Sequence, residues 1–201
     1  MLTIALAKGR IEKKVMEILC SKYPLDLNNY KNSRKLILKT NYFNLILVKA
    51  CDVPIYVDTG IADLGIVGRD TILESSLDLY ELRYLSFGKC RMSLAAKNNQ
   101  IMDNPPSILR VATKYPKISS KYLNEKKLSF RLIPLMGSVE LAPLVDLSDV
   151  IIDIVETGNT LKANNLYEID SFLEITSSVV SNHSSYKFKK AEINNFLEQI
   201  V

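Results

Sequence analysis

The sequence predicts an α/β protein with mostly parallel sheets. Short apolar runs of strand length alternate along the chain with segments in which apolar residues recur at helical spacing. The run at residues 150–155 is almost continuously apolar, as expected of a strand that is covered on both faces. With 201 residues and 47% hydrophobic content, the chain can bury a substantial core in one large domain or two small lobes.

The expected organisation is one lobe inserted into another. Residues 1–88 together with 172–201 form the first lobe, and residues 89–171 form the second. The first lobe opens with a strand at residues 2–7, followed after a short turn by a helix. Its other expected elements are strands at 35–40 and 44–49, joined as a hairpin or by a tight connection, a helix at 52–59, a strand at 63–67 and a helix through Ile72 and Leu73.

The second lobe continues the alternation, and the tail closes the first lobe. The expected elements of the second lobe are strands at 91–97, 109–112, 129–133 and 150–155, and helices at 115–124, 138–144 and 159–164. In the tail we expect a strand at 174–180 and a single amphipathic helix at 185–200. Its apolar positions are Phe188, Ile193, Phe196, Leu197 and Ile200.

Composition excludes several classes of protein. With 26 Lys and Arg against 22 Asp and Glu, the balance does not call for a nucleic-acid partner. The apolar amino terminus reaches a charged turn at Lys8, so it is too short for a signal peptide or a membrane helix, and we expect a cytoplasmic protein. Three cysteines without a C-x-x-C pattern indicate neither a disulfide framework nor a zinc site.

The turns that follow the expected strands are the places to look for chemistry. In open α/β sheets, ligands bind beyond the carboxyl ends of the strands. The turns of interest are residues 8–10, 68–70, 113–114, 137–140 and 156–160.

The last of these turns has the composition of a phosphate-binding loop. Gly158 lets the backbone approach a phosphate, the first amides of the next helix are unpaired donors, and Thr157 and Thr160 add hydroxyl groups. Asp153 and Glu156 precede it, where carboxylates can hold ribose hydroxyls or a hydrated magnesium ion. Ordinary helix caps use the same residue types, so the loop taken alone also fits a structural role.

A family resemblance extends over several of these turns. Residues 156–166, Glu-Thr-Gly-Asn-Thr-Leu-Lys-Ala-Asn-Asn-Leu, closely resemble the signature of the ATP phosphoribosyltransferases, which begin histidine biosynthesis. The segments 4–10, 62–70, 110–116 and 137–143 resemble further motifs of that family in the same order. The resemblance implies a two-lobed fold like that of periplasmic binding proteins, with the active site in the interlobe cleft.

The resemblance also implies a reaction, a cofactor and a partner. N1 of ATP is joined to the ribose of phosphoribosyl pyrophosphate, and pyrophosphate leaves with the help of Mg²⁺. The chain resembles the short form of the family, whose members depend on a regulatory subunit similar to histidyl-tRNA synthetase and assemble as a hetero-octamer. No nucleic acid or membrane partner is expected.

The resemblance assigns roles to particular residues. Lys8, Arg10 and Glu140 are the expected catalytic residues, with the two cations on phosphate groups and Glu140 on the nucleotide. The expected substrate-binding residues are Gly9, Lys49, Arg69, Asp70, Asp153, Glu156, Thr157, Gly158, Asn159, Thr160 and Leu161. Asp153 or Glu156 would hold the metal through water, and the one histidine, His183, receives no role.

Simpler explanations exist for some of these residues. Asp70 and Glu140 would also serve as acidic residues near a helix start, and Lys8 as a surface lysine. At the level of the whole chain, the alternatives are a solute-binding or ligand-sensing protein of the same fold, and a phosphoribosyltransferase that uses another nitrogen nucleophile.

Overall fold

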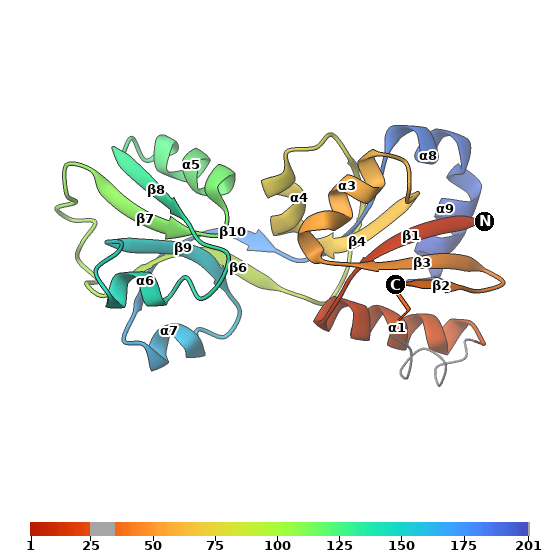
Figure 1. Ribbon diagram of the computed structural model, residues 1–201, viewed down its shortest axis with the longest axis horizontal. Helices are drawn as coiled ribbons and strands as arrows, with labels where there is room; N and C mark the ends of the chain where they lie inside the picture. The colour runs from red at the N-terminus through yellow and green to blue at the C-terminus, as the bar shows by residue number, and fades with distance from the viewer. Residues whose placement is uncertain (25–34, 201) are drawn as a thin grey trace. The chain divides into compact units, whose positions relative to one another are not determined.

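The chain folds into two compact α/β units. The computed structural model describes residues 1–24 and 35–200. One unit comprises Met1–Gly88 and Thr176–Val201, and the other Lys89–Ile175 (Figure 1). Each unit is built on one sheet with helices, which confirms the predicted α/β class.

The first unit contains a six-stranded sheet in the order β2-β3-β1-β4-β11-β5. Its strands are β1 (Leu2–Ala7), β2 (Ile37–Lys39), β3 (Phe43–Val48), β4 (Leu64–Gly68), β5 (Tyr80–Tyr84) and β11 (Ser177–Ser181). Its helices are α1 (Arg10–Lys22), the 3-10 turn η1 (Ala50–Asp52), α3 (Val53–Asp58), α4 (Arg69–Ser75), α8 (His183–Phe188) and α9 (Lys190–Gln199).

Alternating side chains of the central strand β1 separate the two cores of this unit. Ile4 and Leu6 pack into a large cluster with residues of α1 and α9, such as Leu19 and Phe196. Ala5 and Ala7 point to the other face, into a cluster that contains Val53 and Val57 of α3. Because both faces of β1 are covered, the whole strand from Leu2 to Ala7 reads as apolar apart from Thr3.

The second unit contains a five-stranded sheet in the order β10-β6-β9-β7-β8. Its strands are β6 (Cys90–Ala96), β7 (Leu109–Thr113), β8 (Phe130–Pro134), β9 (Val150–Val155) and β10 (Tyr167–Ile175). Its helices are α5 (Pro116–Glu125), α6 (Leu141–Leu144) and α7 (Asn159–Ala163). The last two pack on one face through Ala142 and Leu161, which join Ile151 and Val155 of β9 in one buried cluster.

The prediction that the sheets are mostly parallel was wrong, because both are mixed. In the first sheet, β1 runs parallel to β3 and β4, whereas the β2-β3, β4-β11 and β5-β11 pairs are antiparallel. In the second, β7 runs parallel to β8 and β9, whereas β6 is antiparallel to both β9 and β10. The antiparallel pairs of the first sheet involve β2, β5 and β11, and those of the second involve β6 and β10.

Two expectations for the tail were also wrong. The single strand expected at 174–180 is in fact the end of β10 and most of β11, which belong to different sheets and are separated by Thr176. The single helix expected at 185–200 is divided into α8 and α9 at Lys189, whose φ of −120° and ψ of 24° are not helical. Phe188, expected in the core, lies at this break and is 79% exposed.

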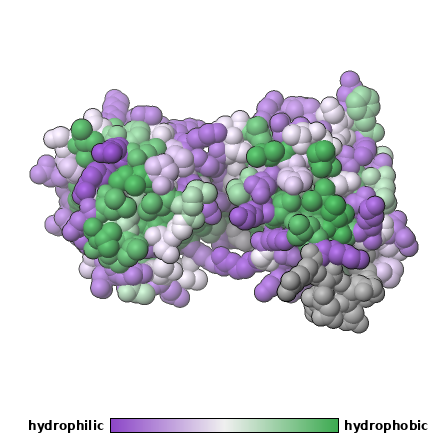
Figure 2. Space-filling view, viewed as in Figure 1, coloured by the Kyte–Doolittle hydropathy of each residue, from purple (hydrophilic) through white to green (hydrophobic). Residues whose placement is uncertain are grey.

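Some apolar side chains remain on the surface of the second unit. Around α6, the residues Leu141, Val145 and Leu147 are exposed, and a patch of apolar atoms is visible on this unit in Figure 2. Within residues 1–24 and 35–200, no helix has the length and apolar character needed to cross a membrane.

Candidate active site

Three cationic side chains follow three adjacent parallel strands of the first unit. β3, β1 and β4 lie side by side, so their carboxyl ends share one edge of the sheet. Lys49, Lys8 and Arg69 are the residues that come directly after these strands. The amide of Lys8 donates to the carbonyl oxygen of Val48 at 2.9 Å, which extends the β1-β3 pairing to the edge itself. The structure thus places Lys8, Lys49 and Arg69 along one sheet edge.

The turn between β1 and α1 depends on Gly9. Gly9 has φ of 108° and ψ of −130°, a conformation that residues with a side chain rarely adopt. Its amide donates to the Glu12 carboxylate at 2.9 Å, so this donor is already used within the turn. Gly9 therefore shapes the turn and starts α1 at Arg10, while the side chains of Lys8 and Arg10 are exposed on either side of it.

Arg69 and Asp70 are more engaged within the unit than the lysines at the same edge. Arg69 Nε donates to Glu81 Oε2 at 3.2 Å, and its guanidinium lies 5.4 Å from the centre of the Tyr84 ring. Asp70 is 7% exposed in the first turn of α4, and its carboxylate folds back over Gly68, where a Cβ atom would overlap it. Both residues support the β4-α4 turn.

In the second unit, three predicted turns also share one sheet edge. β9, β7 and β8 are parallel neighbours, so the turns after Val155, Thr113 and Pro134 lie at the same edge. Two of these turns continue into short helices, with Gly158 and Glu140 as the residues before α7 and α6. The helix expected at 138–144 is shorter than predicted and begins at Leu141, so Glu140 precedes it and is partly buried.

The loop after β9 is anchored at both ends and exposed between them. Val155 at its start is 6% exposed and Leu161 in α7 is also 6% exposed, and both belong to one buried cluster. Between them, Gly158 has φ of 77° in the left-handed region, and its carbonyl accepts from Lys162 at 3.0 Å. The side chains between these anchors, Glu156, Thr157, Asn159 and Thr160, are exposed. The loop is a fixed backbone with accessible polar groups.

Leu161 and Asp153 have more internal positions than the rest of the loop. Leu161, expected to contact substrate, points its side chain into the core and can offer a ligand only its main chain. Asp153 lies within β9 opposite Ser93 of β6, and its Oδ1 accepts from the amide of Ile154 at 2.8 Å.

An ion pair beside the loop was not predicted from the sequence. Arg91, at the start of β6, donates from Nε and Nη2 to the Glu168 carboxylate of β10, both at 2.5 Å. Arg91 Nη1 also donates to the carbonyl oxygen of Glu156 at 3.3 Å, and Ser93 Oγ donates to Glu168 Oε1 at 2.7 Å. The Arg91 hydrogen bonds hold the pKa of Glu168 below its ordinary value despite some burial. No sequence pattern marks this pair, because its members lie 77 residues apart.

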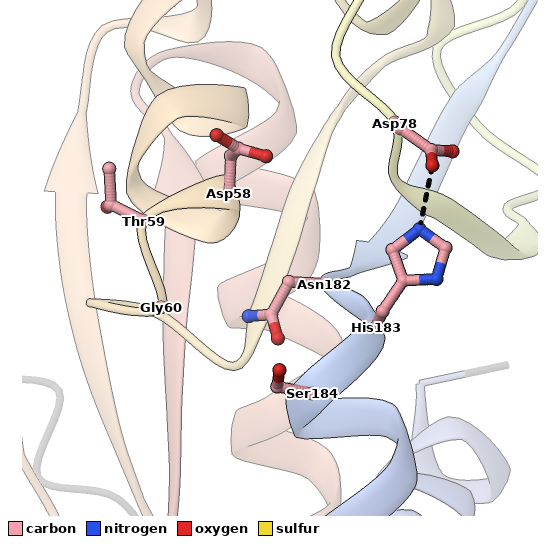
Figure 3. Close-up of a pocket in the computed structure, with 7 residues that line it drawn as sticks. All are labelled: Asp58, Thr59, Gly60, Asp78, Asn182, His183 and Ser184. Carbon is pink, nitrogen blue, oxygen red and sulfur yellow. Dashed lines mark ion pairs between the residues drawn. The ribbon is translucent and has the colours of Figure 1, made fainter.

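A shallow pocket lies at the other edge of the first sheet. Its volume is about 290 Å³, and Figure 3 shows the seven residues that line it: Asp58, Thr59, Gly60, Asp78, Asn182, His183 and Ser184. His183 Nε2 lies 3.1 Å from Asp78 Oδ2. Asn182 is buried and donates to the carbonyl oxygens of Val57 and Ala62. Because β11 runs antiparallel to β4, this pocket is at the opposite edge from Lys8.

Comparison with known proteins identifies the family. The HisG family model, described as ATP phosphoribosyltransferase, matches residues 49–201. An ATP phosphoribosyltransferase of Clostridioides difficile (strain 630) is 48% identical over 198 residues, which cover 98% of this chain and 95% of that protein. One of Alkaliphilus metalliredigens (strain QYMF) is 45% identical over 202 residues, with 98% and 95% covered.

Solved structures agree with the sequence comparison. A chain of the ATP phosphoribosyl transferase (HisG:HisZ) complex from Thermotoga maritima superposes with a TM-score of 0.87 at 38% identity, covering 100% of this chain and 96% of that one. The alkanesulfonate-binding protein SsuA from Xanthomonas axonopodis pv. citri shares only the fold, with a TM-score of 0.58 at 11% identity and coverage of 99% and 71%. The chain therefore belongs to the ATP phosphoribosyltransferase family, whose reaction is the first step of histidine biosynthesis.

Proposed function

We propose that this chain binds ATP and phosphoribosyl pyrophosphate and joins N1 of the adenine to C1 of the ribose. The N1 lone pair forms the new bond to C1 while the bond from C1 to the pyrophosphate oxygen breaks. N1 carries no proton in ATP, so no general base is required. The protein's task is to align two polyanions and to stabilise the charge on the leaving pyrophosphate.

The loop at residues 157–161 is the proposed site for the 5-phosphate of the donor substrate, bound through main-chain amides and hydroxyls, and its geometry is the observation that supports this function best. Its exposed hydroxyls belong to Thr157 and Thr160, and the left-handed Gly158 turns the main chain at the start of α7. With five residues, α7 has too small a dipole to bind an anion by itself, so the local amide and hydroxyl donors have to supply most of the attraction.

Lys8 and Arg10 are the proposed contacts to other phosphate groups of the substrates. Both side chains are exposed on either side of the Gly9 turn, and the Arg10 guanidinium has the planar fork that suits phosphate oxygens. Lys49 is proposed as a third cation for the nucleotide. Arg69 and Asp70 remain proposed contacts for the nucleotide, although their bonds within the first unit leave them fewer groups to offer.

Mg²⁺ is the proposed cofactor, since it neutralises phosphate oxygens and makes pyrophosphate a better leaving group. In the part of the chain that the structure describes, no three or more His, Cys, Asp and Glu residues are grouped so that they could enclose a metal ion. This fits Mg²⁺, which commonly keeps several waters and binds through substrate phosphates and one or two carboxylates. Asp153 or Glu156 would hold it through water, and Glu140 would contact the nucleotide.

A regulatory subunit is the proposed partner. The Thermotoga maritima relative was solved as a HisG:HisZ complex, and this chain covers 96% of the matched chain. We therefore propose a partner similar to histidyl-tRNA synthetase and a hetero-octameric assembly. The proposed location is the cytoplasm, where ATP and phosphoribosyl pyrophosphate are available.

The test is pyrophosphate release in a mixture of the chain, its regulatory subunit, Mg²⁺, phosphoribosyl pyrophosphate and a nucleophile. Release with ATP, but not with adenine or orotate, is the expected result. Release with another base and not with ATP would replace this activity by that of a different phosphoribosyltransferase. Substrate binding without release in the complete mixture would favour a ligand sensor.

A further inference from the structure

The phosphate loop begins at a main-chain carbonyl that is held by an arginine from a neighbouring strand. Arg91 Nη1 donates to the carbonyl oxygen of Glu156 at 3.3 Å, and Arg91 lies directly opposite Val155 in the β6-β9 ladder. Because β6 is antiparallel to β9, Arg91 lies at the edge where the loop leaves the sheet. It is thus the side chain of β6 best placed to fix the start of the loop.

Arg91 is itself held in place by hydrogen bonds to Glu168, which Ser93 in turn supports. Glu168 accepts from Nε and Nη2 of Arg91 in a bidentate pair, and Ser93, two residues along β6 on the same face, donates to Glu168. The Arg91 and Glu168 side chains are 36% and 26% exposed. A planar guanidinium fixed on one side by a carboxylate has a defined direction for its remaining N–H groups, and one of these meets the loop.

We propose that Arg91 is a positioning residue for the donor substrate: with Glu168 and Ser93 it clamps the Glu156 carbonyl, so that the amides and hydroxyls of residues 157–160 are preorganised for the 5-phosphate. This inference rests on the phosphate role proposed for the loop. It assigns no contact with substrate to Arg91 and acts through the backbone alone. Misplacing binding groups by about 1 Å can cost about 100-fold in rate, so a partial loosening has a measurable effect.

The same unit offers a matched control. Arg110 and Asp149 form another arginine–carboxylate pair, with Nη2 to Oδ1 at 2.6 Å and with side chains that are 44% and 19% exposed. Arg110 Nη1 also holds a main-chain carbonyl, that of Asp146, at 2.8 Å. This pair lies at the amino ends of β7 and β9, the edge away from the loop.

The experiment compares Arg91→Lys with Arg110→Lys. Lysine keeps the charge but has no planar fork, so it cannot hold the carboxylate and the carbonyl together. We expect Arg91→Lys to weaken phosphoribosyl pyrophosphate binding, measured by calorimetry in the presence of Mg²⁺, about tenfold, and Arg110→Lys to change it less than about twofold. The affinity for ATP, measured without phosphoribosyl pyrophosphate, should change to the same extent in the two variants. The thermal midpoint of unfolding should also change to the same extent in both.

Glu168→Gln, alone and combined with Arg91→Lys, tests whether Glu168 acts through Arg91. If Glu168 acts through Arg91, then Glu168→Gln weakens donor binding, and adding it to Arg91→Lys causes little further loss. Additive losses, equal losses in Arg91→Lys and Arg110→Lys, or unchanged donor binding in Arg91→Lys would each overturn the inference. Failure of the wild type to release pyrophosphate with its regulatory subunit would reject the proposed reaction separately, because the binding comparison does not require turnover.

Discussion

Gly158 is the residue whose backbone conformation matters most to the proposed phosphate site. Its φ of 77° lies in the left-handed region, and an added Cβ would meet Val155 Cγ1 at 3.9 Å, which is ordinary contact. Alanine at this position is therefore disfavoured by backbone strain, whereas space for its side chain is available. The strain costs about 1 kcal/mol, and the loop can relieve it by changing shape.

We predict that Gly158→Ala lowers kcat/KM for phosphoribosyl pyrophosphate about tenfold, which corresponds to about 1.4 kcal/mol of transition-state binding. Gly60→Ala is the matched control, because Gly60 has φ of 75° and open space around its Cα but lies at the pocket edge of the other unit. Thr160→Ala should lower kcat/KM as well, with a stability change within about 0.5 kcal/mol for an exposed residue. Parallel losses of activity and thermal stability in all three variants would remove the loop's role in binding.

A buried aspartate joins the two ends of the chain in the first unit. The Asp63 carboxylate is 6% exposed and accepts from the amide of Thr3 at 2.9 Å, from Ser185 Oγ at 2.8 Å and from Lys189 Nζ at 2.8 Å. Burial alone would raise the pKa of Asp63, but the hydrogen bonds from Lys189, Thr3 and Ser185 outweigh it and lower the pKa below its ordinary value. The carboxylate form therefore stabilises the fold.

The stability that Asp63 adds should be present at neutral pH and lost in acid. In the unfolded chain the group titrates at about pH 3.9, so the contribution is complete above that pH and disappears as pH falls through the lower folded pKa. We predict that Asp63→Asn costs about 2 kcal/mol at pH 7, measured by urea unfolding, and that its difference from wild type shrinks below about pH 4. Asp146→Asn, which alters a surface ion pair with Lys97, is the control and should leave the pH dependence of the unfolding free energy unchanged. A pH-independent difference for Asp63→Asn would contradict the linkage.

At the residue scale, the sequence predicted the loops better than the side-chain partners. Gly158 and the threonines beside it are local signals, and so is the turn at Lys8. The Arg91–Glu168 and Asp63–Lys189 pairs join residues 77 and 126 positions apart, and only the strand order brings them together. Arg69 illustrates the same limit, because its partner Glu81 lies in β5, a strand that the sequence did not indicate.

Among the elements, α3 packs on β4 more closely than a side chain on the strand would permit. A Cβ atom on Gly65 would come within 2.7 Å of Val57 and 2.8 Å of Val53, both on the helix. β4 supplies the Gly68-Arg69-Asp70 turn, so this close packing also supports the sheet edge that carries the cations.

We predict that Gly65→Ala destabilises the protein by about 2 kcal/mol through overpacking, measured by urea unfolding. Gly137→Ala is the control, because Gly137 has open space around its Cα and no positive φ. Equal stability of the two variants would mean that α3 moves away from β4 without appreciable cost.

The elements that the sequence misjudged have weak or interrupted patterns. β10 carries two register shifts, between Glu168 and Asp170 and between Ser171 and Leu173, which break the alternation that identifies a strand. β5 is an edge strand of largely polar or exposed residues. The tail helix breaks at Lys189, whose side chain reaches Asp63, a tertiary contact that helical periodicity cannot reveal.

For the whole molecule, alternation of strands and helices was enough to predict the α/β class but not the direction of the strands. The parallel core of each sheet, β3-β1-β4 and β9-β7-β8, follows from βαβ connections that are visible in the sequence. The antiparallel strands β6, β10 and β11 lie next to the two points where the chain passes from one unit to the other, at Gly88 and at Ile175. The direction of these strands depends on which sheet the chain enters at each point. The division expected at 171 and 172 falls inside β10.

At the scale of the assembly, the proposed partner leads to a prediction about control of the reaction. In the Thermotoga maritima relative, the chain of this type is part of a complex with HisZ, and this chain matches it over its whole length. We expect the chain alone to release pyrophosphate slowly and the regulatory subunit to raise kcat about tenfold or more, a change of about 1.4 kcal/mol in barrier height. Because the partner is proposed as a regulatory subunit, we expect histidine to inhibit the complex and to leave the residual activity of the chain alone unchanged. A pyrophosphate-release assay over a titration of the subunit, with and without histidine, checks both effects. Full activity of the isolated chain, or its inhibition by histidine without a partner, would show that this protein controls its own reaction.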